Sequence, residues 1–330
     1  MGRTWTWLRL SYRRQRLELL LFAVSVIAVA GAMLWLTSQI VELRALRDEC
    51  LADIPERCDA IVASAYAPTQ NIQLLLMLSE LAPFALGIVL GAPLIAREIE
   101  GRTAQLAWTM TRSRIRWLVG RVGFVALFVA LCLGILAITS EAAAAILDPE
   151  RNLAQDFNFA EHRGWILVAR GLFVLMIAIL VGAVLGRLLP GLLAASLLSA
   201  AIIFGFGVVD SAILKGEARL MRMDPQTGVA AGRGSLYLDS GLELTDGTVH
   251  TWEQVSRLGI DADYGDDRSG LRYASEADLA AGRPVGHEVA WIVPGDRYPA
   301  VTARRAAMLG LLGLLSFVAV AAVVERRRPE

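Results

Sequence analysis

Six long apolar stretches, separated by polar segments, dominate the pattern of this chain. They are rich in Leu, Ala, Val, Ile, Gly and Phe and cover residues 19–37, 72–95, 119–140, 165–187, 191–211 and 305–324. A helix needs about 20 apolar residues to cross the hydrocarbon core of a bilayer, where its backbone must be hydrogen-bonded within the segment. The pattern therefore predicts six membrane-spanning helices and an all-α polytopic membrane fold.

The first apolar stretch also resembles a secretion signal. Arginines precede it, and Ala28, Val29 and Ala30 form a small-residue motif of the kind that signal peptidase cleaves. Its apolar residues continue through Leu36, however, which makes the stretch too long for an ordinary signal core. We therefore expect an uncleaved first span.

Arginine placement predicts the direction of the spans. Arginines gather in the N-terminal segment, in the connection after the second span and in the C-terminal tail, whereas acids outnumber basic residues in 38–71, 141–164 and 213–302. Because cytoplasmic loops of membrane proteins carry an excess of Lys and Arg, both termini are expected in the cytoplasm and the three acidic segments outside. The predicted location is the plasma membrane, with lipid around the spans.

The polar segment between the fifth and sixth spans is long for a loop without structure of its own. Short alternating runs at 235–238 and 248–252 flank turn signals such as Asp246 and Gly247, which predicts a few strands, with one helix near 275–282. We therefore expect a small extracellular α+β domain between helices 5 and 6. The predicted division is 1–212 for the first five spans with a cytoplasmic segment at 96–118, 213–302 for the extracellular domain, and 303–330 for the sixth span and tail.

Composition and charge exclude several other classes of protein. Hydrophobic residues make up 55% and charged residues 19% of the 330 residues, and the mean hydropathy is +0.52, which argues against a soluble enzyme or a disordered chain. The formal net charge of zero provides no basic field for nucleic acid. The only lysine, Lys215, stands between Leu214 and Gly216, so the sequence has no Gly-Lys-Ser/Thr phosphate-binding loop.

The sequence offers no set of residues that suggests catalysis or a metal site. The three histidines, His162, His250 and His287, are scattered and lack zinc-binding spacing. The acidic run at 261–267 departs from the calcium-loop pattern, which puts its glycine sixth, and a solvated loop explains it better. We therefore expect no enzyme activity and no cofactor on this chain.

Two of the three cysteines share the first external segment. A disulfide between Cys50 and Cys58 is permitted there, because the outside of the cell is oxidising. Closing so short a loop would stabilise the segment by about 2.5 kcal/mol in the chain-entropy account. Cys132 lies inside the third span and is expected to be a small apolar residue there.

Charged residues inside or next to the spans form two expected pairs. Glu80 and Arg170 both lie in the outer halves of their spans, and Asp210 ends the fifth span where Arg304 and Arg305 open the sixth. Charges at such depth usually pair with one another, and they also mark substrate routes. The pairs therefore either pin helices together or, in the case of Glu80 and Arg170, line a polar route.

Proline and glycine positions predict local features of two spans. Pro83 follows Glu80 by one turn and is expected to loosen the second span there. Gly87 and Gly91 in the second span, and Gly182 and Gly186 in the fourth, have the four-residue spacing of closely packed membrane helices. The spacing predicts a close helix contact without identifying the partner helix.

The cytoplasmic connection after the second span contains residues that typically end or begin helices. Gly101 can end the second span, residues 103–110 can form a short helix, and Ser113 can cap the third span. On composition alone, an ordinary arginine-rich cytoplasmic loop explains the segment better.

This connection resembles the first cytoplasmic connection of type-2 (ABC-2) exporter permeases, in an actinobacterial-like branch. The residues that match in register are Ala96, Arg97, Glu98, Glu100, Thr103, Leu106, Ala107, Trp108, Thr109, Ser113, Arg114, Arg116 and Trp117. The chain departs at Gly101 and Arg102, since the family's glycine usually stands one place later. The six-span count and a tryptophan–arginine segment with Trp5 and Trp7 also fit the family.

The resemblance implies a permease that exports a substrate across the cell membrane with a separate ATPase. It implies two copies of that ATPase, which would hold ATP and magnesium, and a second permease copy as a homo- or heterodimer. It also implies a coupling helix that seats on the ATPase, and the residues that would carry this role are Glu98, Glu100, Arg102, Leu106, Trp108 and Arg114.

A different class of protein is also compatible with the sequence. The extracellular domain is not implied by the resemblance, and it could bind a ligand or partner in a motor-independent membrane sensor or assembly protein. One simple observation distinguishes the two hypotheses, namely whether a neighbouring gene encodes an ATPase with a phosphate-binding loop. Only an exporter subunit needs such a gene.

Overall fold

The computed structural model describes most of the chain and divides it into two compact units. It describes residues 2–53, 59–101, 113–223, 234–244, 247–257, 271–272 and 286–326, with the backbone alone at 2–14, 51–53, 59–62 and 271–272. A helical unit contains Met1–Pro149, Phe159–Gly205 and Thr302–Glu330. A second unit contains Glu150–Asn158 and Phe206–Val301.

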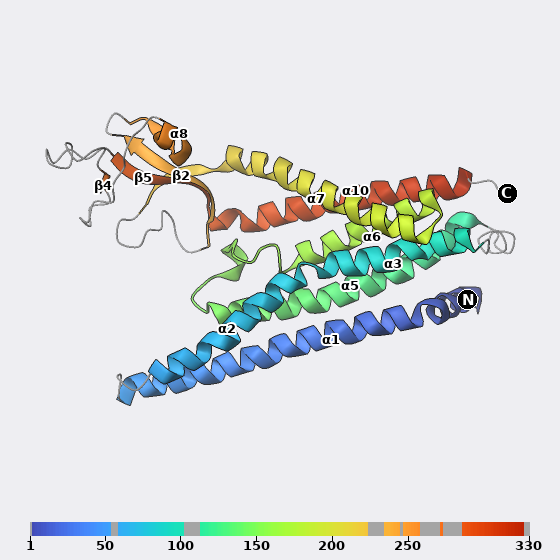
Figure 1. The fold of residues 1–330 in the computed structure, drawn as a ribbon, viewed down its shortest axis with the longest axis horizontal. Helices are drawn as coiled ribbons and strands as arrows, with labels where there is room; N and C mark the ends of the chain where they lie inside the picture. Colours follow the sequence, from blue (N-terminus) through green and yellow to red (C-terminus); the bar gives the residue numbers. More distant parts are fainter. Residues whose placement is uncertain are drawn as a thin grey trace. The chain divides into compact units, whose positions relative to one another are not determined.

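Seven long helices account for most of the described residues (Figure 1). They are α1 (Gly2–Asp53), α2 (Asp59–Ser79), α3 (Ala82–Glu100), α5 (Arg114–Leu147), α6 (Trp165–Leu185), α7 (Leu188–Glu217) and α10 (Tyr298–Arg326). Together α2 and α3 make one span, so six candidate membrane spans result. Each overlaps one of the six predicted stretches, and the fourth ends at Leu185, slightly before the predicted end. The predicted multi-pass helical fold is therefore confirmed.

Helices α1 and α2 continue beyond the apolar stretches as a helical hairpin, so that most of the polar segment 38–71 is helical (Figure 1). Ile40 of α1 and Ile72 of α2 are buried in one apolar cluster. Arg44 extends from α1 to the end of α5, where its Nη2 donates a hydrogen bond of 3.0 Å to the Leu147 carbonyl. The sequence predicted an acidic external segment here but not its helical form.

Glycines bring the backbones of α3 and α6 into direct contact. A Cβ atom added to Gly91 would lie 2.8 Å from the Leu175 carbonyl oxygen, and one added to Gly182 would lie 2.5 Å from that of Ala92. The structure thus identifies α3 and α6 as the partners in the close helix contact. Gly186 has a different role, since it ends α6 in the left-handed conformation with a φ of 63°.

The second span is broken between α2 and α3, as the position of Pro83 predicts. Helix α2 ends at Ser79, Glu80 lies in the turn, and α3 begins at Ala82 with its proline in the first turn. Because proline has no N–H, the carbonyl of Ser79 loses its helical donor four residues on. The break therefore places Glu80 in a turn, at a point where the helical backbone is not fully paired.

The second unit contains an antiparallel sheet in the order β1-β5-β2-β3, with β4 paired to β5. Its strands are β1 (Arg219–Arg222), β2 (Leu236–Leu244), β3 (Val249–Thr251), β4 (Leu271–Arg272) and β5 (Gly286–Val293), and the helix α8 (Trp252–Arg257) follows β3. This is the small α+β fold that the sequence predicted. The helix predicted near 275–282 lies outside the described residues.

Residues 150–158, from the connection between the third and fourth spans, also belong to this second unit. Phe157 is buried beside Leu214 and Val293, and its ring meets that of Tyr298 edge-on with centroids 5.4 Å apart. Its N–H donates a hydrogen bond of 2.9 Å to the Gly234 carbonyl. The segment therefore contributes core to a unit that the sequence analysis began at 213.

An ion pair links two strands of the sheet at its surface. Arg222 Nε of β1 lies 2.7 Å from Glu243 Oε2 of β2. The hydrogen bond from Arg222 lowers the pKa of the Glu243 carboxyl, while the same contact raises the pKa of Arg222. Because the pair is exposed, its effect on stability is small.

Candidate functional site

The cytoplasmic connection predicted from the sequence lies between α3 and α5. Gly101 ends α3, and its N–H donates a hydrogen bond of 2.9 Å to the Arg97 carbonyl. Ser113 precedes α5, and its side chain accepts a hydrogen bond from the Arg116 N–H. Residues 102–112 lie outside the described residues, and with them the predicted coupling residues Arg102, Leu106 and Trp108.

Side chains at the end of α3 contact two other helices. Arg97 Nη1 lies 2.6 Å from Glu18 Oε1 of α1. Glu100 Oε2 accepts a hydrogen bond of 2.9 Å from the Leu188 N–H at the start of α7, where a carboxylate satisfies an unpaired helical donor and complements the helix dipole. Movement of the end of α3 would therefore be transmitted through these contacts to α1 and α7.

The start of α5 is attached to the end of α10. Arg114 Nη1 donates hydrogen bonds of 3.4 Å and 3.3 Å to the carbonyl oxygens of Val324 and Glu325. The last carbonyls of a helix lack intrahelical donors, and a guanidinium satisfies them while complementing the negative end of the helix dipole. Both ends of the connection are thus attached to helices distant in the sequence.

A buried ion pair joins α3 to α5 beneath the connection. Glu98 of α3 and Arg121 of α5 form this pair, and their side chains are 7% and 12% exposed. The Arg121 guanidinium carbon lies 5.5 Å from the ring centroid of Trp117, within the range of a cation–π contact. Sequence analysis missed Arg121, although a charge inside the apolar stretch 119–140 is itself a signal of function.

A second group of charged side chains lies at the other end of the helices. Arg170 of α6 bonds two carboxylates, Glu80 at 3.3 Å between Nη1 and Oε1, and Glu161 through Nη2. Glu161 also accepts from Arg305 of α10, with 2.6 Å between Nη1 and Oε1. His162 Nδ1 lies 3.6 Å from Glu80 Oε2. We call these five side chains the outer charge network, after the outer side on which the sequence predicts Glu80 and Arg170.

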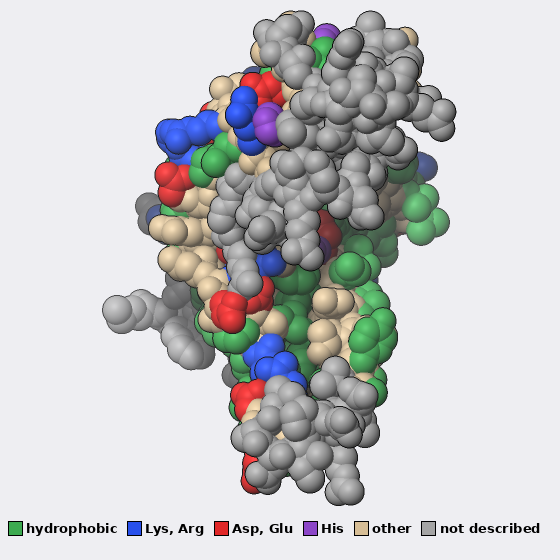
Figure 2. Space-filling view, turned by 90° about the vertical axis from the view of Figure 1, so that its left-hand side faces the viewer, with side chains coloured by type: hydrophobic (Ala, Val, Ile, Leu, Met, Phe, Trp, Pro, Cys, Tyr) green, Lys and Arg blue, Asp and Glu red, His purple; other side chains and the backbone are tan. Residues whose placement is uncertain are grey.

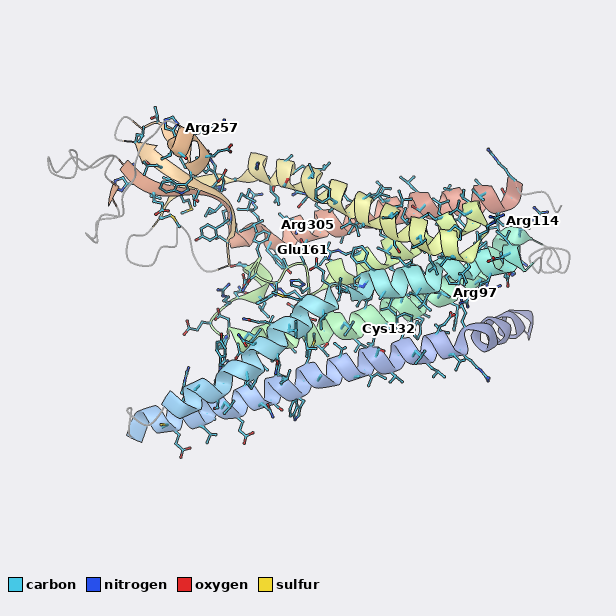
Figure 3. The ribbon with its side chains drawn as sticks, in the orientation of Figure 1. Arg97, Arg114, Cys132, Glu161, Arg257 and Arg305 are labelled. Carbon is cyan, nitrogen blue, oxygen red and sulfur yellow. The ribbon has the colours of Figure 1, made fainter. Side chains whose placement is uncertain are left out.

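The outer charge network connects three helices and the segment that precedes α6. Glu80 comes from the break in the second span, Arg170 from α6 and Arg305 from α10. Figure 3 shows Glu161 and Arg305 close together, whereas Arg97 and Arg114 lie toward the opposite end of the helical unit. The structure brings the predicted pair Glu80 and Arg170 together and adds partners that sequence reasoning did not find.

Within this network, the arginine side chains are buried more deeply than the glutamate side chains. The side chains of Arg170 and Arg305 are 8% and 12% exposed, whereas those of Glu80 and Glu161 are 42% and 41% exposed. Figure 2 shows acidic and basic side chains interspersed on the face turned to the viewer there. The two arginines and two glutamates of the network balance in formal charge, and the carboxylates are the more exposed partners.

The other predicted pairs are not tested by the described contacts. Asp210 belongs to the second unit, while Arg304 and Arg305 belong to the helical unit, and the pairing between them stays a prediction. Cys58 lies outside the described residues, so its predicted disulfide with Cys50 stays a prediction as well. Among the described residues, no group of three or more His, Cys, Asp or Glu side chains could hold a metal ion.

Comparison with known proteins identifies one similarity. A family model described as "ABC-2 membrane transporter related" matches residues 22–209, which is more than half of the chain. The matched region contains the connection between α3 and α5 and most of the first five candidate spans. No curated protein and no solved structure matches the chain.

Proposed function

Because the chain belongs to the ABC-2 membrane transporter-related family, we propose that it is the permease subunit of an ATP-driven exporter. The family match carries this proposal, and the six candidate membrane spans support it. The sequence has no Gly-Lys-Ser/Thr motif around its only lysine, so ATP and magnesium would be bound by a separate ATPase subunit.

The connection between α3 and α5 is the proposed docking segment for that ATPase. In this proposal Arg102, Leu106 and Trp108 contact the ATPase. Glu100 attaches the segment to the start of α7, and Arg114 attaches it to the end of α10. Glu98 has an internal role, because its buried pair with Arg121 holds α3 to α5. A push on the connection would then reach α1, α5, α7 and α10 together.

Helix α3 is the proposed carrier of motion through the membrane. It runs from the connection to the break at Glu80, and Gly91 and Gly182 hold it against α6 at backbone contact. Helices packed so closely move as a unit, since their contact is not continuously deformable. ATP binding would bias the bundle between two packings that already exist.

Copy number and orientation follow from the same proposal. Two permease copies would enclose the transport path, with two ATPases at the arginine-rich end. The start of α1, the end of α3, the start of α5 and the end of α10 lie at one end of the helical unit (Figure 1). The arginines in and between these segments support a cytoplasmic location for that end. The sheet of the second unit would then lie outside the cell.

One observation keeps the alternative function open. The family match ends at residue 209, before β1, so the sheet has no assigned role in transport. A motor-independent sensor or assembly protein would use this unit to bind a ligand or partner, and it would need no ATPase.

Affinity purification in mild detergent, followed by mass spectrometry, tests the proposed function. We expect an ATPase with a phosphate-binding loop to co-purify with the wild-type chain. The double variant Glu100→Ala with Trp108→Ala should lose the ATPase, because both changes fall on the docking segment. Trp165→Ala is the matched control, since Trp165 is an 84% exposed tryptophan at the start of α6. If no ATPase co-purified with the wild-type chain, this result would falsify the exporter assignment.

A further inference from the structure

Four exposed arginines lie at the end of the helical unit that carries the connection between α3 and α5. They are Arg16 of α1, Arg116 of α5, Arg187 between α6 and α7, and Arg326 of α10. Within the part of the chain that the structure describes, their side chains form no hydrogen bond and no ion pair. We call these four residues the flanking arginines. Their guanidinium donors are available to a partner from outside the chain.

Contacts between helices place all four flanking arginines at this end. Arg16 lies two residues before the contact of α1 with the end of α3, and Arg187 directly precedes the first residue of α7, whose N–H bonds the end of α3. Arg116 follows Arg114 by two residues, and Arg114 bonds the end of α10, which contains Arg326. Figure 3 shows Arg114 at this end of the helical unit.

The flanking arginines stand where the exposed apolar surface of the candidate spans ends. One lies between the fourth and fifth spans, and the other three lie within two residues of a span's end. Their exposed apolar neighbours include Leu17, Leu20 and Leu21 on α1, Ile115 and Val119 on α5, and Val184, Leu185 and Leu189 beside Arg187. In a membrane, lipid tails would cover such a surface, and the arginines would lie at the depth of the headgroups.

Arginines at the opposite end of the helical unit are instead paired with carboxylates of the chain. The pairs are Arg47 with Asp48, Arg163 with Glu141, Arg170 with Glu80, and Arg305 with Glu161.

Acids near the flanking arginines are mostly engaged elsewhere. Glu18 pairs with Arg97, Glu98 pairs with Arg121, and Glu100 bonds the start of α7, while the exposed Glu325 offsets one charge beside Arg326. Residues 1–14, 102–112 and 327–330 add eight arginines and a single acid, Glu330. The chain therefore leaves a surplus of positive charge at this end.

From the missing partners, the depth and the charge surplus, we propose that the flanking arginines bind the phosphate groups of anionic phospholipids. A guanidinium binds a phosphate through two parallel N–H···O bonds, and the acyl chains of the same lipid would cover the neighbouring leucines. Lipid fits this position better than an acidic protein surface, because a soluble partner does not reach the apolar surface beside the arginines. The proposal goes beyond the exporter function and does not depend on an ATPase.

Native mass spectrometry of the purified full-length chain tests the proposal. The chain is released from mixed micelles that contain equal amounts of phosphatidylglycerol and phosphatidylcholine with identical acyl chains, so the two lipids differ in the net charge of the headgroup. A basic residue near an anionic surface favours binding about fivefold. We therefore expect the chain to retain phosphatidylglycerol over phosphatidylcholine by at least about tenfold. Equal retention of the two lipids overturns the proposal.

Substitutions locate the lipid binding to the flanking arginines. Changing all four to glutamine should lower the retention ratio at least about fivefold, whereas changing all four to lysine should keep it within about threefold, because the charge remains. Gel filtration and thermal unfolding confirm that each variant is folded. A wild-type ratio in the glutamine variant overturns the proposal, and so does an equal loss in both variants, since charge would then not be the cause.

A variant with the same loss of charge elsewhere serves as the control. Arg47, Arg222 and Arg257 have 47%, 62% and 75% of their side-chain surfaces exposed, and Arg219 is exposed as well. Changing these four to glutamine should leave the retention ratio at the wild-type value. An equal loss there would mean that the net charge of the chain attracts the lipid, and the assignment to the flanking arginines would fail.

An acidic surface of the proposed ATPase is the competing partner for these arginines. If the glutamine variant lost the ATPase on affinity purification but retained phosphatidylglycerol as the wild type does, the arginines would belong to ATPase docking and the lipid proposal would fail. If the wild-type chain preferred phosphatidylglycerol and recruited no ATPase, the lipid site would stand and the exporter assignment would be rejected.

Discussion

The buried pair of Glu98 and Arg121 is the clearest single-residue feature of the helical unit, because it places two charges among apolar side chains. Arg121→Met should lower the free energy of unfolding by about 3–5 kcal/mol, since it leaves Glu98 buried without its cationic partner. Thermal unfolding in detergent, followed by tryptophan fluorescence, measures the change.

The paired substitution is the control for this prediction. Glu98→Leu combined with Arg121→Met removes both charges and should recover most of the lost stability, because apolar residues often replace a buried pair at little cost. If the double variant were no more stable than Arg121→Met alone, the contact between the two charges would not be the source of the loss.

Single-residue inference from the sequence succeeded where a charge interrupted an apolar stretch visibly. Glu80 and Arg170 were recognised because they stand alone inside their spans, and the structure brings them together. Glu161 and His162 were missed because they lie in a polar connection, where nothing local distinguishes them from solvated residues. Their proximity to Arg170 and Glu80 arises from the fold, which no sequence pattern encodes directly.

At the scale of elements, the contact between α3 and α6 makes two glycine-to-alanine changes opposite in effect. Gly182→Ala should destabilise the chain by roughly 1–3 kcal/mol, since its Cβ would meet the Ala92 carbonyl oxygen at 2.5 Å. Gly123→Ala in α5 should stabilise it by up to about 1 kcal/mol, because nothing lies within 4 Å and alanine is the better helix former.

Thermal unfolding in detergent measures both glycine variants under one condition. Stabilisation by Gly182→Ala would contradict the backbone contact between α3 and α6. Equal destabilisation by both variants would point to membrane-helix flexibility rather than packing as the cause.

The elements themselves were predictable to the extent that hydropathy signals them. Each apolar stretch is helical, since lipid leaves the backbone no other partner, and only the second is divided between two helices, α2 and α3. The helical hairpin beyond the spans was not predicted, because polar residues of 38–53 lack a strong periodic signal even though Ile40 is buried. The second unit's use of 150–158 was equally hidden, since it depends on contacts with residues such as Gly234.

For the whole molecule, the proposed orientation predicts which sites a membrane-impermeant maleimide can reach in intact cells. In a background with serine at positions 50, 58 and 132, Glu49→Cys on α1 and Glu253→Cys on α8 should be labelled from outside. Glu325→Cys at the end of α10 should be labelled only after permeabilisation. All three native side chains are exposed, so access is limited by the membrane alone.

The opposite labelling pattern would reverse the orientation and place the arginine-rich end outside. If Glu49→Cys were labelled from outside and Glu253→Cys were not, the hairpin and the sheet would lie on opposite sides of the membrane. Gel-shift of the labelled chain provides the measurement, with permeabilised cells as the control for reactivity of each cysteine.

The length of helix α1 allows it to act as a lever. Its 52 residues span about 78 Å at a rise of 1.5 Å per residue, well over twice the thickness of the hydrocarbon core. Its contact with Arg97, at Glu18, lies about one third of the way along the helix, and the hairpin with α2 lies at the far end. A tilt of a few degrees about that contact would move the far tip through several ångströms. In the proposed orientation, a small displacement at the cytoplasmic end would therefore become a larger displacement of the hairpin outside the cell.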